Sequence, residues 1–208
     1  MFLVHPHNPS GTVNAAKAWD DFLIAAAART TVIVDEAYID YDDPARTAVR
    51  LTRVGHNVAV FRTFDKIHGL AALPFGYLVA SPALAAELRA AGVGAVHGLG
   101  RLAIAGALAS LSDPAWIAEV RRRTLDGRDR LVRALYELGL EHSESRANFI
   151  FFRSGAAPVL REGLSRAGIL AGRAFPPLDD WIRITVGTED EVTRTIAALR
   201  ALVGSKPA

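Results

Sequence analysis

Three ionisable residues lie in surroundings where an isolated charge is costly. Lys66 follows a strand-like run, Asp35 ends a β-branched run, and Arg183 lies inside an apolar one. Partial burial lowers the pKa of a lysine side chain, which makes its amine a nucleophile or a proton carrier. An arginine inside an apolar strand is costly unless an anion pairs with it. These positions therefore predict amine chemistry at residue 66 and anion binding at residue 183.

Each of these residues also has an ordinary structural explanation. A single lysine is most often exposed to solvent, and Arg183 could form a salt bridge inside the protein. The segment 34–37 (Val-Asp-Glu-Ala) could end in solvated acids or supply the metal-binding acid of a P-loop ATPase. The ATPase hypothesis needs a Gly-x-x-x-x-Gly-Lys-Ser/Thr loop, which the sequence does not contain. For Glu36 a solvated carboxylate is the expectation, and no role is assigned to it.

The rest of the sequence alternates between strand-like and helical segments. Asn14, Ser81 and Asp113 are the expected helix caps, and a proline follows each of the last two. Strands that alternate with helices predict an α/β fold with a mostly parallel sheet. Strands are expected at residues 2–5, 31–35, 57–62, 75–80, 149–153 and 181–186, and helices at 15–29, 82–91, 114–139, 158–167 and 189–202.

These elements divide into two regions. Residues 1–125 are expected to form part of a large domain whose mostly parallel sheet is flanked by helices, and residues 126–208 a small C-terminal α/β domain. A buried-type strand begins at the second residue, so the sheet is expected to be incomplete. The arginines of residues 121–133 alternate with acids and are expected to form one solvated helix face.

Composition excludes several classes of protein. Lys and Arg number 24 against 22 acids, and a net charge of +2 gives little reason to expect nucleic-acid binding. The absence of cysteine excludes thiol catalysis, cysteine-ligated zinc and disulfides. The longest mostly apolar stretch, residues 102–111, is too short to span a bilayer, and residues 1–6 lack a signal-peptide pattern. A cytoplasmic protein without a membrane partner is expected. His5, His7 and His68 lack metal-ligand spacing, so no metal site is predicted.

Four short segments carry a pattern that none of them would establish alone. They are residues 5–12 (His-Pro-His-Asn-Pro-Ser-Gly-Thr), 34–38 (Val-Asp-Glu-Ala-Tyr), 62–70 (Arg-Thr-Phe-Asp-Lys-Ile-His-Gly-Leu) and 181–188 (Trp-Ile-Arg-Ile-Thr-Val-Gly-Thr). In order and spacing they resemble segments of the fold-type-I pyridoxal-phosphate-dependent aminotransferases of the histidinol-phosphate aminotransferase type. The chain is similar to the C-terminal portion of that family.

The resemblance implies a pyridoxal 5'-phosphate cofactor held by several residues. Lys66 matches the lysine that forms a Schiff base with the cofactor and then carries a proton to and from the substrate. Asp35 matches the carboxylate that favours a proton on the ring nitrogen. Tyr38 and Asn8 match residues that hydrogen-bond the phenolic oxygen, and the bond between Asn8 and Pro9 is expected to be cis.

The resemblance also implies substrate-binding residues. Arg183 matches the arginine that holds the substrate α-carboxylate through a bidentate contact. Asn148 corresponds to a residue near the substrate, although an asparagine that satisfies local backbone is an equal alternative. Arg173 is expected to line the same opening.

Two positions depart from the family pattern near the cofactor phosphate. Asp65 replaces a usual serine or threonine, and Pro74 replaces a common arginine. A carboxylate about 4 Å from a phosphate charge costs roughly 4 kcal/mol per pair at an effective dielectric near 20. Thr63 remains as a hydroxyl donor, and Arg62 could offset the repulsion. The family's N-terminal segment, with its glycine-rich phosphate loop, is not present in this sequence.

The resemblance implies transamination between an L-amino acid or amino phosphate and a 2-oxo acid, by a homodimer. Two alternatives stay open. A decarboxylase of an amino-acid phosphate shares these motifs. A truncated, non-catalytic remnant that keeps the fold is favoured by Asp65, Pro74 and the missing N-terminal segment.

Overall fold

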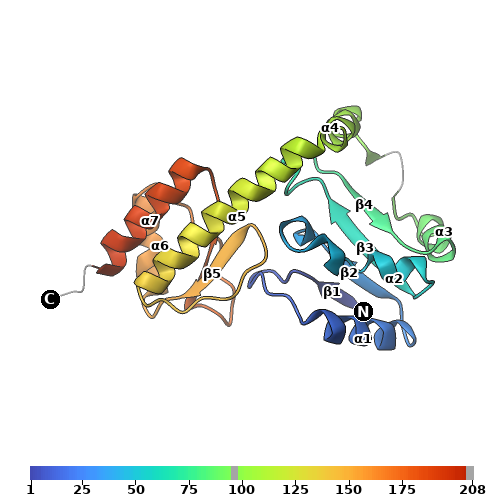
Figure 1. The fold of residues 1–208 in the computed structure, drawn as a ribbon, viewed down its shortest axis with the longest axis horizontal. Helices are drawn as coiled ribbons and strands as arrows, with labels where there is room; N and C mark the ends of the chain where they lie inside the picture. The colour runs from blue at the N-terminus through green and yellow to red at the C-terminus, as the bar shows by residue number, and fades with distance from the viewer. Residues whose placement is uncertain (95–97, 205–208) are drawn as a thin grey trace. The chain divides into compact units, whose positions relative to one another are not determined.

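The computed structural model describes residues 1–94 and 98–204 and divides into two compact units (Figure 1). Unit 1 contains residues 1–6 and 13–119, and unit 2 contains residues 7–12 and the chain from Val120 onward. The division falls between Glu119 and Val120, inside the long helix α5 (Pro114–Glu137), where the sequence led us to expect a boundary near Asp126. No sequence pattern indicated that residues 7–12 belong with the C-terminal part of the chain.

Unit 1 is built on a four-stranded sheet in the order β1-β2-β3-β4. Its strands are β1 (Phe2–Val4), β2 (Val32–Asp35), β3 (Val58–Thr63) and β4 (Gly76–Val79). The first three strands are parallel to one another, whereas β4 is antiparallel to β3. The mostly parallel sheet predicted from the sequence is therefore confirmed, and each predicted strand lies within two residues of its expected bounds.

Helices accompany the strands of this sheet. They are α1 (Ala16–Ala27), α2 (Val49–Arg53), α3 (Pro82–Ala90) and α4 (Arg101–Leu111), with two short 3-10 helices, η1 (Ile39–Tyr41) and η2 (Pro44–Arg46). Helix α1 packs on β2 and α2 on β3. Valines of β2 and β3 are buried against the apolar faces of these helices, and the core they form comprises Trp19, Leu23, Ala26, Ala27, Val32, Val34, Ala48, Leu51, Val58 and Val60.

Two helix caps predicted from the sequence, Asn14 and Ser81, lie in unit 1. Ser81 caps α3, and its hydroxyl accepts a hydrogen bond from the Leu84 amide at 3.4 Å. Asn14 was wrongly predicted as the cap of α1, because the cap position is Ala15 and no side chain fills that role. The Asn14 amide instead donates to the His5 ring at 3.3 Å, and its carbonyl accepts from Arg46 at 3.0 Å. These tertiary contacts replace the local cap.

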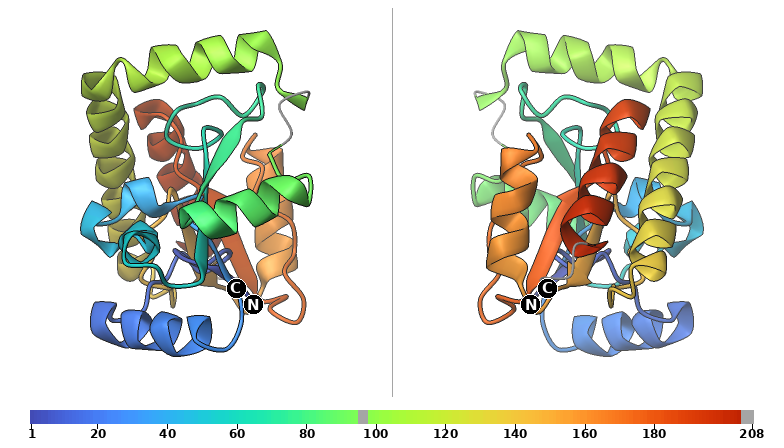
Figure 2. Two further views of the ribbon diagram at one scale, coloured as in Figure 1. Left: turned by 90° about the vertical axis from the view of Figure 1, so that its right-hand side faces the viewer. Right: turned by 90° about the vertical axis from the view of Figure 1, so that its left-hand side faces the viewer.

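Unit 2 joins an antiparallel pair of strands to helices. The strands are β5 (Phe149–Arg153) and β6 (Trp181–Thr185), and the helices are α6 (Ala157–Arg166), α7 (Glu189–Gly204) and the part of α5 that begins at Val120. Figure 2 shows α6 and α7 side by side. Ile182 and Ile184 of β6 point into the core, so the intervening Arg183 lies on the opposite face of the strand.

Helix α5 corrects the expectation of a fully solvated basic face. Arg122 is exposed and pairs with Asp126 at 2.8 Å, as expected for a surface helix. Arg128, however, is only 9% exposed, and its guanidinium donates to the Ala147 carbonyl at 3.1 Å. It lies on the buried stripe with Gly127 and Leu131. The alternation of charges in the sequence did not reveal which arginine the core would enclose.

The loop of residues 7–12 is fixed within unit 2. The Ser143 hydroxyl donates to the Ser10 carbonyl at 2.6 Å, and the Arg146 amide donates to the Gly11 carbonyl at 2.7 Å. Gly11 has a φ of 71°, and a Cβ there would lie 2.0 Å from the Ser145 hydroxyl oxygen. The bond between Asn8 and Pro9 is cis, which confirms the prediction.

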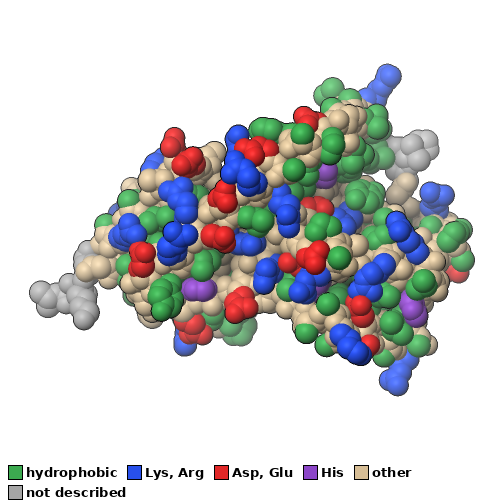
Figure 3. All heavy atoms as spheres, in the orientation of Figure 1, with side chains coloured by type: hydrophobic (Ala, Val, Ile, Leu, Met, Phe, Trp, Pro, Cys, Tyr) green, Lys and Arg blue, Asp and Glu red, His purple; other side chains and the backbone are tan. Residues whose placement is uncertain are grey.

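The surface carries both signs of charge. Basic and acidic side chains are interspersed on the face drawn in Figure 3, in keeping with the net charge of +2. Among residues 1–94 and 98–204, no helix has the length and apolarity needed to cross a membrane.

Candidate active site

The loop that follows β3 carries Lys66 in unit 1. This loop is closed by two backbone hydrogen bonds of 3.0 Å, from Gly69 to the Lys66 carbonyl and from Leu70 to the Phe64 carbonyl. The side chains of Phe64 and Ile67, which come before and after Lys66 in this loop, are buried. Lys66 itself is half-buried, and its Nζ lies 5.7 Å from the centre of the Tyr38 ring. The two residues are therefore neighbours, as a shared role at one cofactor requires.

Asp35 ends the strand beside β3. One of its carboxylate oxygens accepts a hydrogen bond from the Ala37 amide at 2.9 Å, and its carbonyl accepts from His5 at 2.9 Å. Because β2 and β3 are parallel neighbours, their carboxyl ends meet at one edge of the sheet, where α/β proteins commonly bind ligands. Asp35 is the last residue of β2 at that edge, Tyr38 comes three residues after β2 ends, and Lys66 comes three residues after β3 ends.

Thr63 is the last residue of β3, and Asp65 immediately precedes the lysine. The Thr63 hydroxyl accepts from the Asp65 amide at 3.0 Å and donates to the Phe75 carbonyl at 3.4 Å. One carboxylate oxygen of Asp65 is buried and has no hydrogen-bond partner among the residues that the structure describes. A buried, unsatisfied carboxylate oxygen is unfavourable, so Asp65 is poorly accommodated at this position. Pro74 is exposed.

Glu36 is not a solvated acid, contrary to the expectation from the sequence. Its side chain is fully buried and accepts hydrogen bonds from the Ala48 amide at 2.6 Å and the Thr47 hydroxyl at 2.7 Å. Arg62 contributes a third donor at 3.0 Å. Burial raises the pKa of the Glu36 carboxyl, while these three donors act in the opposite direction. Arg62 is therefore engaged with carboxylates of the protein, and the suggestion that it offsets the charge of Asp65 is not supported.

Unit 2 holds the second group of predicted residues around Arg183. Its Nη1 donates to the Asn8 side-chain oxygen at 2.7 Å. The guanidinium lies 5.1 Å from the centre of the Phe149 ring and 5.2 Å from that of Phe175. Its Nε is buried without a hydrogen-bond partner in the described part of the chain. The guanidinium thus lies between two aromatic rings and makes no ion pair with a carboxylate of the described residues, contrary to the internal salt-bridge alternative.

Arg173 and Asn148 lie on neighbouring parts of unit 2. The Arg173 guanidinium lies 4.5 Å from the centre of the Phe175 ring, so the two arginines share one aromatic partner. The Asn148 carbonyl accepts from the Val186 amide at 2.9 Å. These contacts place Arg173 next to the same ring as Arg183, and they fix Asn148 at the start of β5.

The predicted residues are thus gathered in two groups, one in each unit. Asp35, Tyr38, Thr63, Asp65 and Lys66 belong to unit 1, and Asn8, Asn148, Arg173 and Arg183 belong to unit 2. Sequence reasoning missed Glu36 and Arg62 as a buried pair. The signal that could have found them is their position, because each lies near the carboxyl end of one of two adjacent apolar strands.

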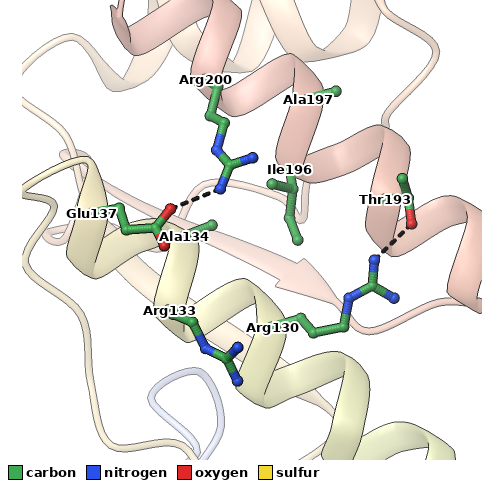
Figure 4. Close-up of a pocket in the computed structure, with 8 residues that line it drawn as sticks. All are labelled: Arg130, Arg133, Ala134, Glu137, Thr193, Ile196, Ala197 and Arg200. Carbon is green, nitrogen blue, oxygen red and sulfur yellow. Dashed lines mark hydrogen bonds and ion pairs between the residues drawn. The ribbon is translucent and has the colours of Figure 1, made fainter.

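Another hollow in unit 2 contains none of these residues. It is a groove of about 360 Å³ between α5 and α7 (Figure 4). Two of its arginines are occupied, since Arg200 pairs with Glu137 at 2.7 Å and Arg130 donates to the Thr193 hydroxyl at 2.7 Å. The lining residues are Arg130, Arg133, Ala134, Glu137, Thr193, Ile196, Ala197 and Arg200.

Comparison with known proteins shows the family. The model of the family described as aminotransferase class I and II matches residues 1–199. The chain belongs to this family. This class I/II aminotransferase chain is 37% identical over 208 residues to the histidinol-phosphate aminotransferase of Symbiobacterium thermophilum, across 98% of the chain and 56% of that protein. It is 33% identical over 205 residues to histidinol-phosphate aminotransferase 1 of Dechloromonas aromatica, across 96% of the chain and 55% of that protein.

A solved structure shows the same fold. The histidinol-phosphate aminotransferase of Sinorhizobium meliloti, in complex with pyridoxal-5'-phosphate, matches this class I/II aminotransferase chain with a TM-score of 0.85 and 27% identity. The match covers 98% of the chain and 57% of that structure. The chain therefore spans somewhat more than half the length of the relatives it matches.

The residues of unit 1 fit pyridoxal phosphate at its ring. Lys66 has an amine that could meet the aldehyde, Asp35 a carboxylate that could meet the ring nitrogen, and Tyr38 a phenol that could meet the ring oxygen. The proximity of the Lys66 amine to the Tyr38 ring supports this fit, because both must reach the same cofactor. The residues expected near the phosphate fit less well, because Asp65 has a carboxylate where a hydrogen-bond donor would be needed.

Proposed function

We propose that the protein catalyses pyridoxal-phosphate-dependent transamination between an L-amino acid or amino phosphate and a 2-oxo acid. The observation that carries the proposal is the distance of 5.7 Å between the Lys66 Nζ and the centre of the Tyr38 ring. Both residues come shortly after the ends of the paired strands β2 and β3, and Asp35 is the last residue of β2. Relatives named histidinol-phosphate aminotransferases support an amino phosphate as donor. Because the chain spans about 55% of their length, the proposal concerns the whole protein.

The roles of the unit 1 residues follow from their chemistry. When bound, pyridoxal phosphate withdraws electrons from the substrate α-carbon. Lys66 would hold the cofactor covalently and move the proton at that carbon through its Nζ. The Asp35 carboxylate would hold a proton on the ring nitrogen, and the Tyr38 hydroxyl would donate to the ring oxygen. The Thr63 hydroxyl would donate to the phosphate in place of its 3.4 Å contact with the Phe75 carbonyl.

The unit 2 residues would orient the substrate. Arg183 would bind its α-carboxylate, since the guanidinium presents a planar set of donors and makes no ion pair with a carboxylate among the described residues. Asn8 would hold Arg183, and its match to the family predicts a hydrogen bond to the ring oxygen of the cofactor. Arg173 and Asn148 would line the substrate site. By this assignment residues 1–125 bind the cofactor and residues 126–208 bind most of the substrate.

Covalent trapping tests the proposal directly. Pyridoxal phosphate added to the intact protein should produce the absorbance of a lysine-bound cofactor, and borohydride should then fix the cofactor on Lys66. Peptide mass spectrometry locates the modified residue, and Lys66→Arg serves as the control. Modification of other lysines alone, or of none, would refute the assignment of Lys66.

A decarboxylase of an amino-acid phosphate is the second candidate. The L-threonine-O-3-phosphate decarboxylase of Porphyromonas gingivalis has the same fold, with a TM-score of 0.81 at 24% identity. Release of carbon dioxide without need for an oxo acid would identify that activity, whereas oxo-acid-dependent amino transfer identifies the aminotransferase. We also propose a cytoplasmic homodimer, in keeping with the family resemblance. Gel filtration with light scattering tests the dimer.

A further inference from the structure

The Arg62 guanidinium binds a different partner with each of its three nitrogens. Its Nε donates to Glu36 at 3.0 Å, its Nη1 to Asp40 at 2.9 Å and its Nη2 to the Thr47 hydroxyl at 3.3 Å. The Arg62 side chain is 14% exposed, and Glu36 is fully buried. A planar fork with several charge-assisted hydrogen bonds has little freedom to move. Arg62 therefore fixes the places of the groups that it contacts.

The two carboxylates lie on either side of Tyr38. Glu36 precedes Tyr38 by two residues and Asp40 follows it by two. The turn between them is closed by backbone hydrogen bonds from Ile39 to the Glu36 carbonyl at 3.2 Å and from Tyr41 to the Tyr38 carbonyl at 3.1 Å. One guanidinium thus holds both ends of the turn that presents Tyr38.

The same guanidinium belongs to the strand that leads to Lys66. Arg62 is the fifth residue of β3 and precedes Lys66 by four positions, and β3 pairs in parallel with β2, from which the Tyr38 turn emerges (Figure 1). The Lys66 Nζ lies 5.7 Å from the centre of the Tyr38 ring. Arg62 therefore ties the turn that carries the phenol to the strand that carries the amine.

We propose that Arg62, through Glu36 and Asp40, is a positioning residue that sets Tyr38 relative to Lys66. This inference rests on the proposed function, because it assigns to Arg62 the alignment of two groups that would act on one cofactor. A buried ion pair adds little stability compared with apolar residues of similar volume. In this protein the pair joins Arg62 to carboxylates at fixed positions in the chain. The arrangement of Glu36 and Asp40 on both sides of Tyr38 indicates which geometry is specified.

The most informative change is Asp40→Ala. Removal of Arg62 or Glu36 would leave a buried charge without its partner and is expected to unfold the protein. Asp40 is one-third exposed, so Asp40→Ala releases one end of the turn and leaves the Glu36 contact in place. The matched control is Asp180→Ala, which removes one of the two carboxylates held by Arg153 in unit 2.

The experiment is a double-mutant cycle with Tyr38→Phe on the intact protein. The first readout is the pH midpoint of the absorbance change of the lysine-bound cofactor. The second needs no cofactor and is the rate at which acetic anhydride acetylates Lys66, followed by mass spectrometry. Asp40→Ala should change the proton affinity of the lysine-bound cofactor by at least about twofold. It should change the acetylation rate of Lys66 by a similar factor, because neighbouring residues in contact are energetically coupled.

The proposal predicts that the shift of the pH midpoint vanishes when Tyr38 is already Phe, because the turn then carries no hydroxyl to align. The change in acetylation rate should persist, because Phe keeps the ring beside the Lys66 Nζ. Asp180→Ala should change neither readout. An equal shift of the pH midpoint with and without the Tyr38 hydroxyl, or an unchanged acetylation rate in Asp40→Ala, would overturn the positioning role. If the parent protein binds no pyridoxal phosphate, the proposed function fails, and the acetylation rates still decide the role of Arg62.

Discussion

Arg183 donates a hydrogen bond of 2.7 Å to the side-chain oxygen of Asn8, a residue 175 positions earlier in the chain. Both residues belong to unit 2, where the loop of residues 7–12 is fixed to residues 143–146. The contact orients the guanidinium between the Phe149 and Phe175 rings. A substrate carboxylate would therefore meet an arginine whose position is already set.

Arg183→Lys tests this relationship. Lysine keeps the charge but cannot offer two parallel donors to a carboxylate while it contacts Asn8. A hydrogen bond to a charged group contributes roughly 1.5–3 kcal/mol, so the Kd for the amino donor should rise about 10-fold to 100-fold. Substrate titration of the cofactor-loaded protein measures the change. Arg153→Lys, on the surface of the same unit, should leave the Kd unchanged, and an unchanged Kd for Arg183→Lys would exclude carboxylate binding there.

The double change Asp65→Ser and Pro74→Arg should tighten the binding of pyridoxal phosphate. It removes a carboxylate with one unsatisfied oxygen and adds a charge-assisted, bidentate donor. At roughly 1.5–3 kcal/mol per hydrogen bond to a charged group, the affinity should rise at least about tenfold. Equilibrium titration measures it, in a protein extended by the family's N-terminal phosphate loop. Pyridoxal, which lacks the phosphate, is the control, and equal gains for both ligands would mean that residues 65 and 74 do not face the phosphate.

Gly11→Ala should destabilise the loop that carries Asn8. Its φ of 71° costs an alanine roughly 1–2 kcal/mol, and its Cβ would also lie 2.0 Å from the Ser145 hydroxyl oxygen. Gly139→Ala is a matched control in unit 2, because its φ is 66° and nothing lies within 4 Å of a Cβ there. Urea unfolding should show a larger loss for Gly11→Ala than for Gly139→Ala. Equal losses would show that the approach to Ser145 is not tight.

His5 should make stability depend on pH. Burial lowers the pKa of His5, with Asp42 opposing the shift and Arg46 adding to it. The unfolded chain therefore binds a proton near the ordinary histidine value of 6.5 while the folded protein does not, so the free energy of unfolding should fall as the pH drops below about 6.5. The loss should stop once the pH passes below the folded pKa. Urea unfolding at several pH values measures it.

Two variants separate the titration of His5 from its packing. His5 stacks on Trp19 with ring centres 4.4 Å apart. His5→Gln should be less stable at pH 8 but should lose less stability on acidification than the parent protein. Trp19→Phe should also be less stable but should keep the parent dependence on pH. A His5→Gln variant with an unchanged dependence on pH would show that other groups are responsible.

Local patterns in the sequence predicted the elements of the fold well. The alternation of strands and helices and the Ser81 cap depend on residues close together in the chain, whereas the cis bond before Pro9 was expected from the family resemblance. The four motifs also sufficed to indicate the family, because each retains its residue types in order. The family resemblance assigned Lys66, Asp35 and Tyr38 to one cofactor, and the structure places the ends of their strands, β2 and β3, side by side.

Contacts between distant segments were decided only by the tertiary structure. The burial of Glu36 depends on Arg62 and on the Thr47 hydroxyl, and the burial of Arg128 depends on the Ala147 carbonyl. The position of Glu36 at the end of an apolar strand is a sequence signal for burial, whereas Arg128 lies among alternating charges that give no such signal. A charge is stable inside a protein only when partners surround it, and those partners come from segments whose placement the sequence pattern does not give.

The loop of residues 7–12 is the clearest case of contacts that the sequence did not predict. Its sequence predicted a Pro/Gly-punctuated turn, and the family resemblance added the cis bond and an asparagine for the cofactor. Only the tertiary structure assigned the loop to unit 2 and joined Asn8 to Arg183. Turn geometry follows from the intrinsic φ preferences of proline and glycine, whereas the choice of partner follows from which distant backbone groups can satisfy the loop.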